Sequence, residues 1–284
     1  MSLIDGKAIA KEIEAEVATF VASLEGRKPG LAFVLVGQNP ASRTYINAKK
    51  KSCARVGILS FDREFPETII QTQLIREIEL LNQNSQVDAI LIQQPLPSHL
   101  HVGNIMSCVS VHKDVDGFHP YNVGCLLLGE KGLIPCTPRG IQYLLETSNI
   151  PVAGKHVIIV GRSNIVGKPL AALLMQKHPG CNATVTVAHS RTENLKTLCL
   201  TADILVAATG HPHLITKDMV KKGAAVIDVG INRVEGRIVG DVDFHSVSAV
   251  ASHITPVPGG VGPMTIAMLL SNTILCYKHH IKVG

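Results

Sequence analysis

The 284-residue sequence has little charge and no long apolar run. Charged residues make up 17% of it, against about a quarter in ordinary globular proteins, while hydrophobic residues make up 46%. This composition excludes a disordered chain, and the length suits two domains. No stretch approaches the roughly 18 apolar residues of a membrane span, and residues 1–7 lack the apolar core of a secretion signal. We therefore expect a soluble, cytoplasmic protein with no membrane partner.

Disulfide, metal and nucleic-acid signatures are also missing. The seven cysteines form no Cys-x-x-Cys pair, and their odd number does not suit a disulfide framework, so we expect reduced thiols. The histidine pairs His99/His101 and His211/His213 have no convincing third ligand, so we predict no metal site. The net charge is only +5, and the longest basic run, 49–51, is not accompanied by an aromatic ladder. These features exclude a dedicated nucleic-acid binder and favour an enzyme with an anionic substrate.

Helix and strand patterns alternate in the first half of the chain. Apolar residues recur at helical spacing over 5–24, with Asp5 as the expected N-cap. Uninterrupted apolar runs follow, which are typical of parallel strands covered on both faces. The predicted strands are 31–37, 58–65 and 88–93, and the predicted helices are 41–56 and 68–82. This order indicates an α/β layer architecture. The segment 95–138, rich in Pro, Gly and His, is expected to be an active-site loop and crossover.

The same rhythm restarts after a connecting helix at 139–149. The predicted strands are 156–160, 184–189, 203–208 and 225–229, and the predicted helices are 165–178, 216–222 and 263–280. We therefore predict two α/β domains: an N-terminal catalytic domain at 1–138 and a doubly wound, Rossmann-type domain at 139–263. The C-terminal helix, 264–284, is expected to pack back on the first domain.

The turn after the apolar strand 157–160 has features of a dinucleotide site. Gly161 lets the backbone turn, and Gly167 allows close packing of the next helix, whose free N–H groups can bind a pyrophosphate. Ser163 stands in place of the middle glycine of the usual Gly-x-Gly-x-x-Gly spacing. By itself, the segment is also compatible with an ordinary strand–helix turn.

The end of the next strand indicates which dinucleotide is bound. An NAD-preferring fold usually has an acidic residue there, whereas this chain has His189, Ser190 and Arg191. A hydroxyl and a guanidinium suit the 2′-phosphate of NADP. The alternative is that Arg191 merely begins the following helix on a solvated surface. Two further strand ends, 207–210 and 228–232, provide candidate ligand-binding segments at the carboxyl edge of the sheet.

Four polar residues of the first half form a candidate chemical site. Tyr45 and Lys49 are four positions apart and share a face of a predicted helix, Gln93 ends a buried strand, and Asp116 lies in a loop. From the residues alone each also has a structural explanation. Lys49 can be a solvated lysine and Tyr45 a packing residue, while Gln93 and Asp116 can order a strand end and a turn.

Five motifs resemble the bifunctional methylenetetrahydrofolate dehydrogenase/methenyltetrahydrofolate cyclohydrolase family, the FolD type. They occur in the family's order over essentially the whole chain, at Ser42–Lys51, Gln93–Pro97, Lys113–Gly117, Gly161–Pro169 and, most specifically, Thr255–Thr265. The resemblance implies a homodimer of two-domain subunits, each with an active-site cleft between its catalytic and NADP-binding domains. It implies oxidation of 5,10-methylenetetrahydrofolate to the methenyl cation by NADP, then hydrolysis to 10-formyltetrahydrofolate.

The resemblance also implies a role for each matching residue. Lys49 would be the central catalytic residue, Gln93 would hydrogen-bond and tune it, and Tyr45 would pack beside the pterin. Asp116 would hold the N–H groups of the pterin. The substrate-lining turn would be Pro258, Gly259 and Gly260, and Gly161, Arg162, Ser163, Ser190 and Ile231 would contact NADP. The residue patterns described above add Gly167 and Arg191 to the predicted cofactor-binding residues.

One position departs from the family pattern, and two other functions remain open. The family usually has leucine where this chain has Gln94. Strand alternation would place that side chain opposite Gln93, so we expect a local packing difference without loss of activity. The alternatives are a dehydrogenase with weak cyclohydrolase activity and a non-catalytic NADP-binding protein. The presence of Lys49 with Gln93 favours the bifunctional enzyme.

Overall fold

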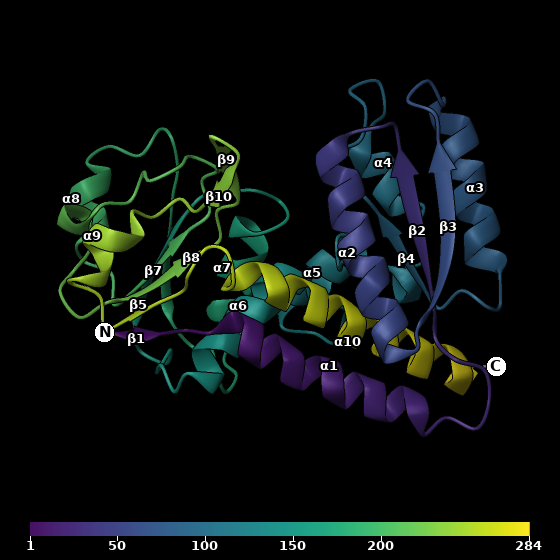
Figure 1. Ribbon diagram of the computed structural model, residues 1–284, viewed down its shortest axis with the longest axis horizontal. Coiled ribbons are helices and arrows are strands. Elements are labelled where there is room, and N and C mark those ends of the chain that lie inside the picture. The colour runs from purple at the N-terminus through teal and green to yellow at the C-terminus, as the bar shows by residue number, and fades with distance from the viewer. Residues whose placement is uncertain (284) are drawn as a thin grey trace. The chain divides into compact units, whose positions relative to one another are not determined.

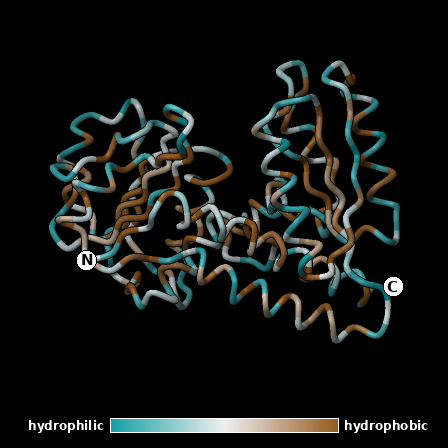
Figure 2. Tube along the Cα trace, in the orientation of Figure 1, coloured by the Kyte–Doolittle hydropathy of each residue, from teal (hydrophilic) through white to brown (hydrophobic). Residues whose placement is uncertain are grey.

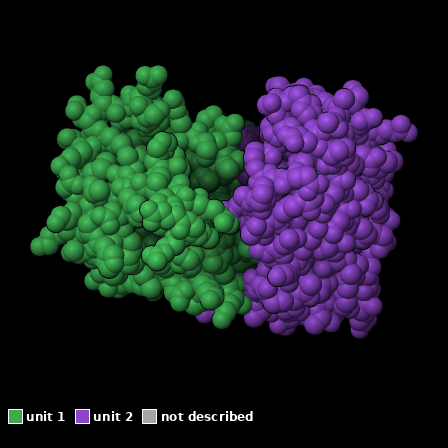
Figure 3. All heavy atoms as spheres, turned by 45° about the horizontal axis from the view of Figure 1, so that its top comes forward, with its two compact units in different colours: residues 1–11, 126–130, 135–268 green, residues 12–125, 131–134, 269–284 purple. Residues whose placement is uncertain are grey.

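A computed structural model describes residues 1–283, which form two compact units (Figure 3). The first unit contains residues 1–11, 126–130 and 135–268. The second contains residues 12–125, 131–134 and the chain from 269 onward. Both units are built from parallel strands and helices (Figure 1), which confirms the predicted α/β class. The domain boundaries after residues 138 and 263 stay a prediction.

The second unit is built on a three-stranded parallel sheet in the order β3-β2-β4. Its strands are β2 (Gly30–Val36), β3 (Leu59–Phe65) and β4 (Ala89–Ile92). The central strand β2 and its neighbour β4 are buried along their whole length, as their uninterrupted apolar sequences predict. Figure 2 shows β2 as a continuous hydrophobic trace. The helices are α2 (Pro40–Val56), α3 (Gln71–Gln83), α4 (Val102–Ser107) and the 3₁₀ turn η1 (Val111–Lys113).

The core of the second unit lies between one face of this sheet and the helices α3 and α4. Leu74 and Ile78 of α3 are completely buried there. Burial of each such side chain contributes about 1.5–3 kcal/mol. Helix α2 begins after Asn39, whose side-chain oxygen accepts hydrogen bonds from two N–H groups of its first turn. It ends at Gly57, which takes the left-handed conformation with φ of 80°. Both ends of the helix that carries Tyr45 and Lys49 are therefore fixed.

The first unit contains a six-stranded parallel sheet in the order β1-β11-β8-β7-β5-β6. Its strands are β1 (Ser2–Leu3), β5 (His156–Val160), β6 (Thr184–Ala188), β7 (Ile204–Ala207), β8 (Ala225–Asp228) and β11 (His253–Ile254). The chain passes from β5 to β6 on one side and then returns to β7 on the other. This reversal is the switch point at which doubly wound sheets bind ligands, so the predicted Rossmann-type order is confirmed.

Short helices and one hairpin complete the first unit. They are α6 (Cys136–Thr147), α7 (Gly167–Leu174), α8 (Leu195–Cys199), the 3₁₀ turn η2 (Lys217–Met219), α9 (Phe244–Ser248), and the hairpin β9 (Asn232–Val234) and β10 (Arg237–Val239). Three more helices contribute residues to both units: α1 (Gly6–Ala22), α5 (Pro120–Leu128) and α10 (Val261–Val283). The Asp5 side chain accepts a hydrogen bond from the Ala8 N–H at 3.0 Å, in keeping with its predicted role as an N-cap.

Three sequence-based predictions are wrong in detail. The helix predicted at 216–222 is only the single 3₁₀ turn η2, because Gly223 turns the chain with φ of 84° before β8. The helix predicted at 165–178 ends at Leu174. The segment 95–138, predicted to be a loop, contains α4 and α5. Pro120 suggests a loop but is the first residue of α5, a position where proline loses no helical hydrogen bond.

Three further features bear on the compositional predictions. Among residues 1–283, no helix is long and apolar enough to cross a membrane. In the same range, no group of three or more histidine, cysteine, aspartate or glutamate side chains could hold a metal ion. All seven cysteines have free thiols, and only Cys108 is not buried.

A hydrogen-bonded cluster around a buried aspartate joins three distant segments of the second unit. Asp88, immediately before β4, is completely buried. Its carboxylate accepts two hydrogen bonds from Arg27, both 2.7 Å long, and one from the Gly30 N–H at 2.8 Å. Nδ1 of His280, in the last turns of α10, lies 2.8 Å from the same carboxylate. The hydrogen bond to Asp88 also raises the pKa of Arg27. The cluster thus connects the C-terminal helix to the start of the sheet.

Loss of Arg27 would leave the Asp88 carboxylate buried with one charged partner fewer. We expect Arg27→Ala to lower the free energy of unfolding, measured in urea, by about 2 kcal/mol. This loss is smaller than that expected for a fully buried ion pair, because the Arg27 side chain is 27% exposed. The control is Arg43→Ala, which removes an ion pair to Glu64 whose side chains are 36% and 46% exposed. It should cost less than about 1 kcal/mol. Equal losses in the two variants would contradict this interpretation.

Candidate active site

Helix α2 brings the predicted catalytic lysine to the end of the buried strand β4. Lys49 is half-buried, and its Nζ donates a hydrogen bond to Oε1 of Gln93 at 3.2 Å. Gln93 directly follows β4, and its Nε2 donates to the backbone carbonyl of Gln94 at 2.6 Å. Tyr45, one turn before Lys49, is 42% exposed. The structure therefore joins Lys49 to Gln93, which lie 44 residues apart in the sequence, and leaves Tyr45 accessible to a ligand.

Cys53 lies one further turn along α2 and is completely buried. Burial raises the pKa of this thiol to about 12, although the positive charge of Lys49 opposes the shift. The thiol is therefore neutral at physiological pH and cannot act as a nucleophile. Because Cys53 is neutral and buried, Lys49 and its amide partner Gln93 are the candidates for proton transfer on this part of α2.

The predicted direction of the Gln94 side chain rests on strand alternation and stays a prediction. Strand β4 ends at Ile92, so strand alternation does not determine the direction of the Gln94 side chain. The peptide bond between Gln94 and Pro95 is cis, as is that between Val257 and Pro258. The Gln94 carbonyl holds the side chain of Gln93, so this residue contributes to the site through its backbone.

The motif 113–117 separates into structural and accessible residues. Nζ of Lys113 donates hydrogen bonds to three backbone carbonyls at the end of α3 and just beyond it, those of Leu81, Asn82 and Asn84, at 3.3, 2.7 and 3.0 Å. The carbonyls of Leu81 and Asn84 also accept backbone hydrogen bonds, from the N–H groups of Asn84 and Val87, so the lysine adds a second donor at this helix end. Burial is the main reason that the pKa of Lys113 is lowered. This lysine therefore anchors the loop to α3.

Asp114 organises the other end of the same loop. It is 1% exposed, and its carboxylate accepts hydrogen bonds from the N–H groups of Phe118 and His119 and from Nδ2 of Asn122, at 3.1, 2.8 and 2.8 Å. Burial raises the pKa of Asp114, and these three donors oppose the shift. Asp116, two positions later, is half-buried. Asp114 therefore has a structural role in this loop, and pterin binding by Asp116 stays a prediction.

The cofactor turn of the first unit depends on two glycines. Gly161 follows β5 with φ of 135°, and a Cβ atom there would lie 2.1 Å from the carbonyl oxygen of Ala208. A Cβ atom on Gly167 would lie 2.1 Å from the carbonyl oxygen of Gly161. Oγ of Ser163 accepts hydrogen bonds from the N–H groups of Val166 and Gly167 at 3.1 and 3.4 Å. The serine that replaces the middle glycine thus caps the start of α7.

These residues fit an anionic dinucleotide. The strand and the helix approach so closely at the two glycines that no side chain fits between them, which is the cradle of a pyrophosphate site. The first turn of α7 contains no acidic residue. Ser190 and Arg191, just beyond β6, are both exposed. Hydrogen bonds from His189 N–H to Thr192 Oγ1 and from Arg191 N–H to His189 Nδ1 hold this turn in place.

Two buried aspartates connect the loops at the same edge of the sheet. The Asp228 carboxylate accepts hydrogen bonds from the N–H groups of Gly230, Asp241 and Val242, at 3.0, 2.9 and 3.0 Å. Burial is the main reason that the pKa of Asp228 is raised, to about 6. The nearby carboxylate of Asp241 adds to this effect, and the three N–H donors oppose it.

Asp241 in turn holds the neighbouring strand ends. It is completely buried and accepts hydrogen bonds from the N–H groups of Thr209 and Gly210 and from Nδ2 of Asn232. Ile231, between these fixed residues, is 46% exposed and thus accessible to a cofactor. The structural roles of Asp114, Asp228 and Asp241 were not among the predictions from sequence. The adjacent glycines Gly230 and Gly240, which leave room for these carboxylates, were the available signal.

The turn Pro258-Gly259-Gly260 is fixed against the start of α1 within the first unit. Gly259 has φ of 112°, and its carbonyl accepts a hydrogen bond from the Lys7 N–H at 2.8 Å. A Cβ atom on Gly6 would lie 2.0 Å from the carbonyl oxygen of Gly260. The backbones of Gly6 and Gly260 touch, which explains the glycine at position 6. Pro258 itself is exposed.

Comparison with known proteins identifies the family. The catalytic-domain model of tetrahydrofolate dehydrogenase/cyclohydrolase matches residues 4–116, and the NAD(P)-binding-domain model of the same family matches residues 135–281. The chain belongs to the tetrahydrofolate dehydrogenase/cyclohydrolase family. The predicted resemblance is therefore confirmed. It also follows that the turn at Gly161 lies within an NAD(P)-binding domain of this family.

Three relatives of this family illustrate the similarity. The bifunctional protein FolD of Protochlamydia amoebophila is 55% identical over 284 residues, covering 97% of each chain. The crystal structure of the bifunctional FolD enzyme of Campylobacter jejuni has a TM-score of 0.94 and 48% identity, covering 98% of this chain and 99% of that one. The Trypanosoma brucei FolD structure, complexed with NADP cofactor and an inhibitor, has a TM-score of 0.93 and 39% identity, covering 99% and 98%.

The role of the Gly161 turn can be tested by adding a single methyl group. Gly161→Ala places Cβ against the Ala208 carbonyl at a φ that alanine rarely adopts, so the turn must shift. We expect NAD(P) binding, measured by calorimetry, to weaken at least about tenfold. The control is Gly26→Ala, because a Cβ atom on Gly26 would meet nothing within 4 Å. Unchanged affinity in a folded Gly161→Ala variant would contradict the proposed cradle.

Proposed function

We propose that the protein oxidises 5,10-methylenetetrahydrofolate to 5,10-methenyltetrahydrofolate with NADP and then hydrolyses this product to 10-formyltetrahydrofolate. The observation that carries the proposal is the hydrogen bond from Lys49 to Gln93 in a chain that belongs to the tetrahydrofolate dehydrogenase/cyclohydrolase family. Relatives that are at least 48% identical over nearly the whole chain are bifunctional FolD proteins. This similarity supports both activities.

The substrate-binding roles follow from the chemistry of the exposed groups. A carboxylate can accept two parallel hydrogen bonds from the amino and ring N–H groups of a pterin, which suits Asp116. The accessible ring of Tyr45 offers an apolar surface on which a pterin can pack. Pro258, Gly259 and Gly260 provide a fixed backbone turn for the folate.

Lys49 acts in the hydrolysis by moving a proton. Water adds to the cationic methenyl carbon and loses a proton, which a neutral lysine can accept. The bond between this carbon and N5 then breaks, and N5 takes up a proton that the lysine can return, which leaves the formyl group on N10. The hydrogen bond to Gln93 orients Nζ. Because the amide is neutral, it adds no negative charge that would favour the ammonium form of the lysine. Gln93 therefore positions Lys49 without adding a charge beside it.

The remaining residues hold the cofactor. Bound NADP accepts a hydride from the methylene carbon, so the task of the protein is to position the two molecules. The positive end of the α7 dipole and the close approach of the backbone at Gly161 and Gly167 suit the pyrophosphate, and Ile231 presents an exposed contact. Ser190 and Arg191 suit the 2′-phosphate of NADP, because β6 is not followed by the acidic residue typical of NAD-preferring folds. Arg162 and Ser163 complete the set that we propose for NADP.

We also propose that the protein is a cytoplasmic homodimer. The seven free thiols suit a reducing compartment. β6 is an edge strand of the six-stranded sheet and offers backbone groups to a second copy. Light scattering on the purified protein should give twice the mass of the chain, and a monomeric mass at micromolar concentration would contradict the dimer.

The proposed activity can be tested in a spectrophotometer. The purified protein, supplied with 5,10-methylenetetrahydrofolate and NADP, should produce NADPH together with the methenyl compound, which should then be hydrolysed. A parallel sample with NAD should react more slowly. No NADPH formation under these conditions would contradict the dehydrogenase, and persistence of the methenyl compound would contradict the cyclohydrolase.

The role of Lys49 has a matched control on the same helix. We expect Lys49→Met to lower the rate of methenyl hydrolysis at least about 100-fold, since it removes the proton acceptor. Lys51→Met removes an exposed lysine two positions away and should change the rate less than about twofold. Hydrolysis by Lys49→Met at the unmodified rate would show that another group takes the proton.

A further inference from the structure

A cavity opens at the amino end of the six-stranded sheet, on the edge opposite the cofactor turn. Its volume is about 230 Å³. The lining residues precede or begin four parallel strands: Lys155 before β5, Asp203 before β7, Lys222 to Ala225 at β8, and Ser252 with His253 at β11. Gly161 follows the other end of β5. A ligand in this cavity would therefore be separated from the cofactor by the length of the strands.

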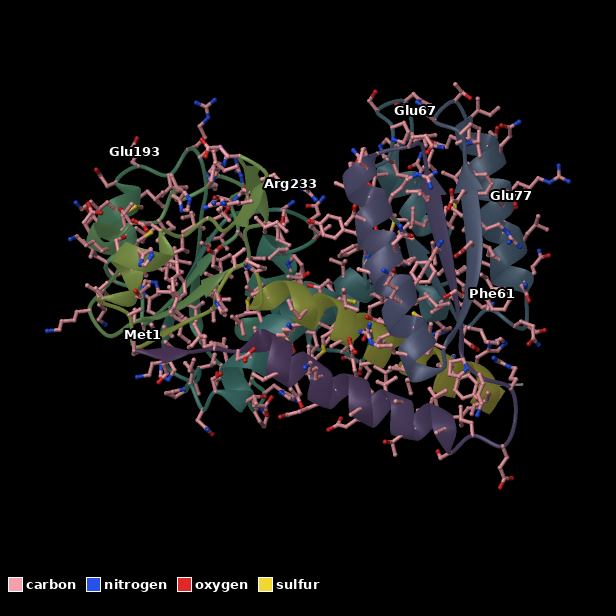
Figure 4. The ribbon with its side chains drawn as sticks, viewed as in Figure 1. Met1, Phe61, Glu67, Glu77, Glu193 and Arg233 are labelled. Carbon is pink, nitrogen blue, oxygen red and sulfur yellow. The ribbon has the colours of Figure 1, made fainter. Side chains whose placement is uncertain are left out.

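Two labelled residues mark the opposite edges of this unit in Figure 4. Met1 precedes β1, whose first residue pairs with His253 at the amino edge. Arg233 lies in β9, three residues after Val229–Gly230 at the carboxyl edge. Figure 4 shows Met1 and Arg233 at opposite ends of the first unit, which agrees with the strand directions.

The cavity has an excess of positive charge. Three lysines line it, Lys155, Lys221 and Lys222, and the only acidic lining residue within the described chain is Asp203. Three positive charges and one negative charge leave a net charge of +2. Nζ of Lys221 donates to Asp203 at 2.7 Å, and the backbone N–H of His156 donates to the same carboxylate at 3.0 Å. Asp203 is thus neutralised by Lys221, and Lys155 and Lys222 supply the excess.

The state of Asp203 agrees with this distribution of charge. The hydrogen bond from Lys221 is the largest reason that the pKa of Asp203 is lowered, and the charge of Lys155 adds to the effect. The carboxylate therefore stays ionised and keeps Lys221 in place. Lys155 is half-buried, whereas Lys222 is exposed at the rim. A ligand would therefore meet the Lys222 ammonium group at the entrance and the Lys155 ammonium group farther inside.

Apolar residues form the floor of the cavity. Ile150, Ile204 and Ala225 line it and are 8%, 1% and 3% exposed. Oγ of Ser252 lies 3.0 Å from Nδ1 of His253, within hydrogen-bond distance, and these two side chains add polar groups to one side of the cavity. A cationic rim above an apolar floor suits an anion with an apolar body. The volume is below the roughly 300–1,000 Å³ of drug-sized sites, so the ligand is smaller than a dinucleotide.

We propose that this cavity is a second anion-binding site, for a small phosphate monoester with an apolar substituent. The phosphate dianion would bind Lys155 and Lys222, since lysine serves as a point-charge partner for phosphate. The apolar substituent would lie on Ile150 and Ile204. The site is independent of the cofactor turn and of the folate-binding residues, and the proposal does not depend on the reaction that the protein catalyses.

Calorimetry with phenyl phosphate as the probe tests the proposal. The titration uses the full-length protein saturated with NADP, so that the cofactor site is filled and cannot take the phosphate. We expect one probe molecule to bind per chain, and more tightly than inorganic phosphate, which lacks the apolar part. Absence of binding under these conditions would overturn the proposal, and equal affinity for inorganic phosphate would overturn the role of the apolar floor.

Matched lysine variants distinguish the cavity from general charge attraction. The double variant Lys155→Ala/Lys222→Ala keeps the Lys221–Asp203 pair and should bind phenyl phosphate at least about tenfold more weakly. The control is Lys177→Ala/Lys217→Ala, which removes the same charge from exposed positions of the same unit outside the cavity. It should bind within about twofold of the unmodified protein. An equal loss in both double variants would overturn the site, provided that both still bind NADP normally, which shows that they are folded.

Discussion

The hydrogen bond between Lys49 and Gln93 is the contact on which the proposed chemistry depends. It joins a capped helix to the end of a completely buried strand, so both side chains start from rigid backbone. The positions of Lys49 and Gln93 follow from ordinary features of the sequence: an asparagine cap, a left-handed glycine and an uninterrupted apolar strand. A catalytic lysine needs such a frame, because proton transfer requires its Nζ within hydrogen-bond reach of the reacting group.

Buried carboxylates position the accessible residues in both units. Asp114 fixes the loop that carries Asp116, and Asp228 with Asp241 fixes the segment that carries Ile231. Each accepts several hydrogen bonds, which offsets the cost of burying a polar group. The raised pKa values of Asp114 and Asp228 reflect their burial in these structural networks. The raised pKa values of these two carboxyl groups therefore mark structural support beside the predicted site residues Asp116 and Ile231.

Regular elements were predictable wherever a single pattern dominated. The strand predicted at 156–160 matches β5. Its four consecutive apolar residues, 157–160, lie between turn signals and form a run too short for a helix, so the sequence pattern indicates a strand. Helices of five residues, such as α8 and α9, complete barely more than one turn and give no helical periodicity to detect. The Lys49–Gln93 pair could not be derived from spacing, because its members lie 44 residues apart, so the resemblance to a family was needed to connect them. The buried aspartates were missed because their role depends on which N–H groups they face, and only the structure gives those partners.

The variant Gln93→Glu tests the role of the neutral amide beside Lys49, because it replaces the amide by a carboxylate of nearly the same size. A carboxylate beside Lys49 would favour the ammonium form, so fewer molecules would have a lysine able to accept a proton. The measurement is the rate of methenyltetrahydrofolate hydrolysis as a function of pH, for the unmodified protein and for the variant. We predict that the variant is slower at neutral pH and that its rate recovers only at higher pH. A pH profile identical to that of the unmodified protein would contradict the central role of the Lys49–Gln93 pair.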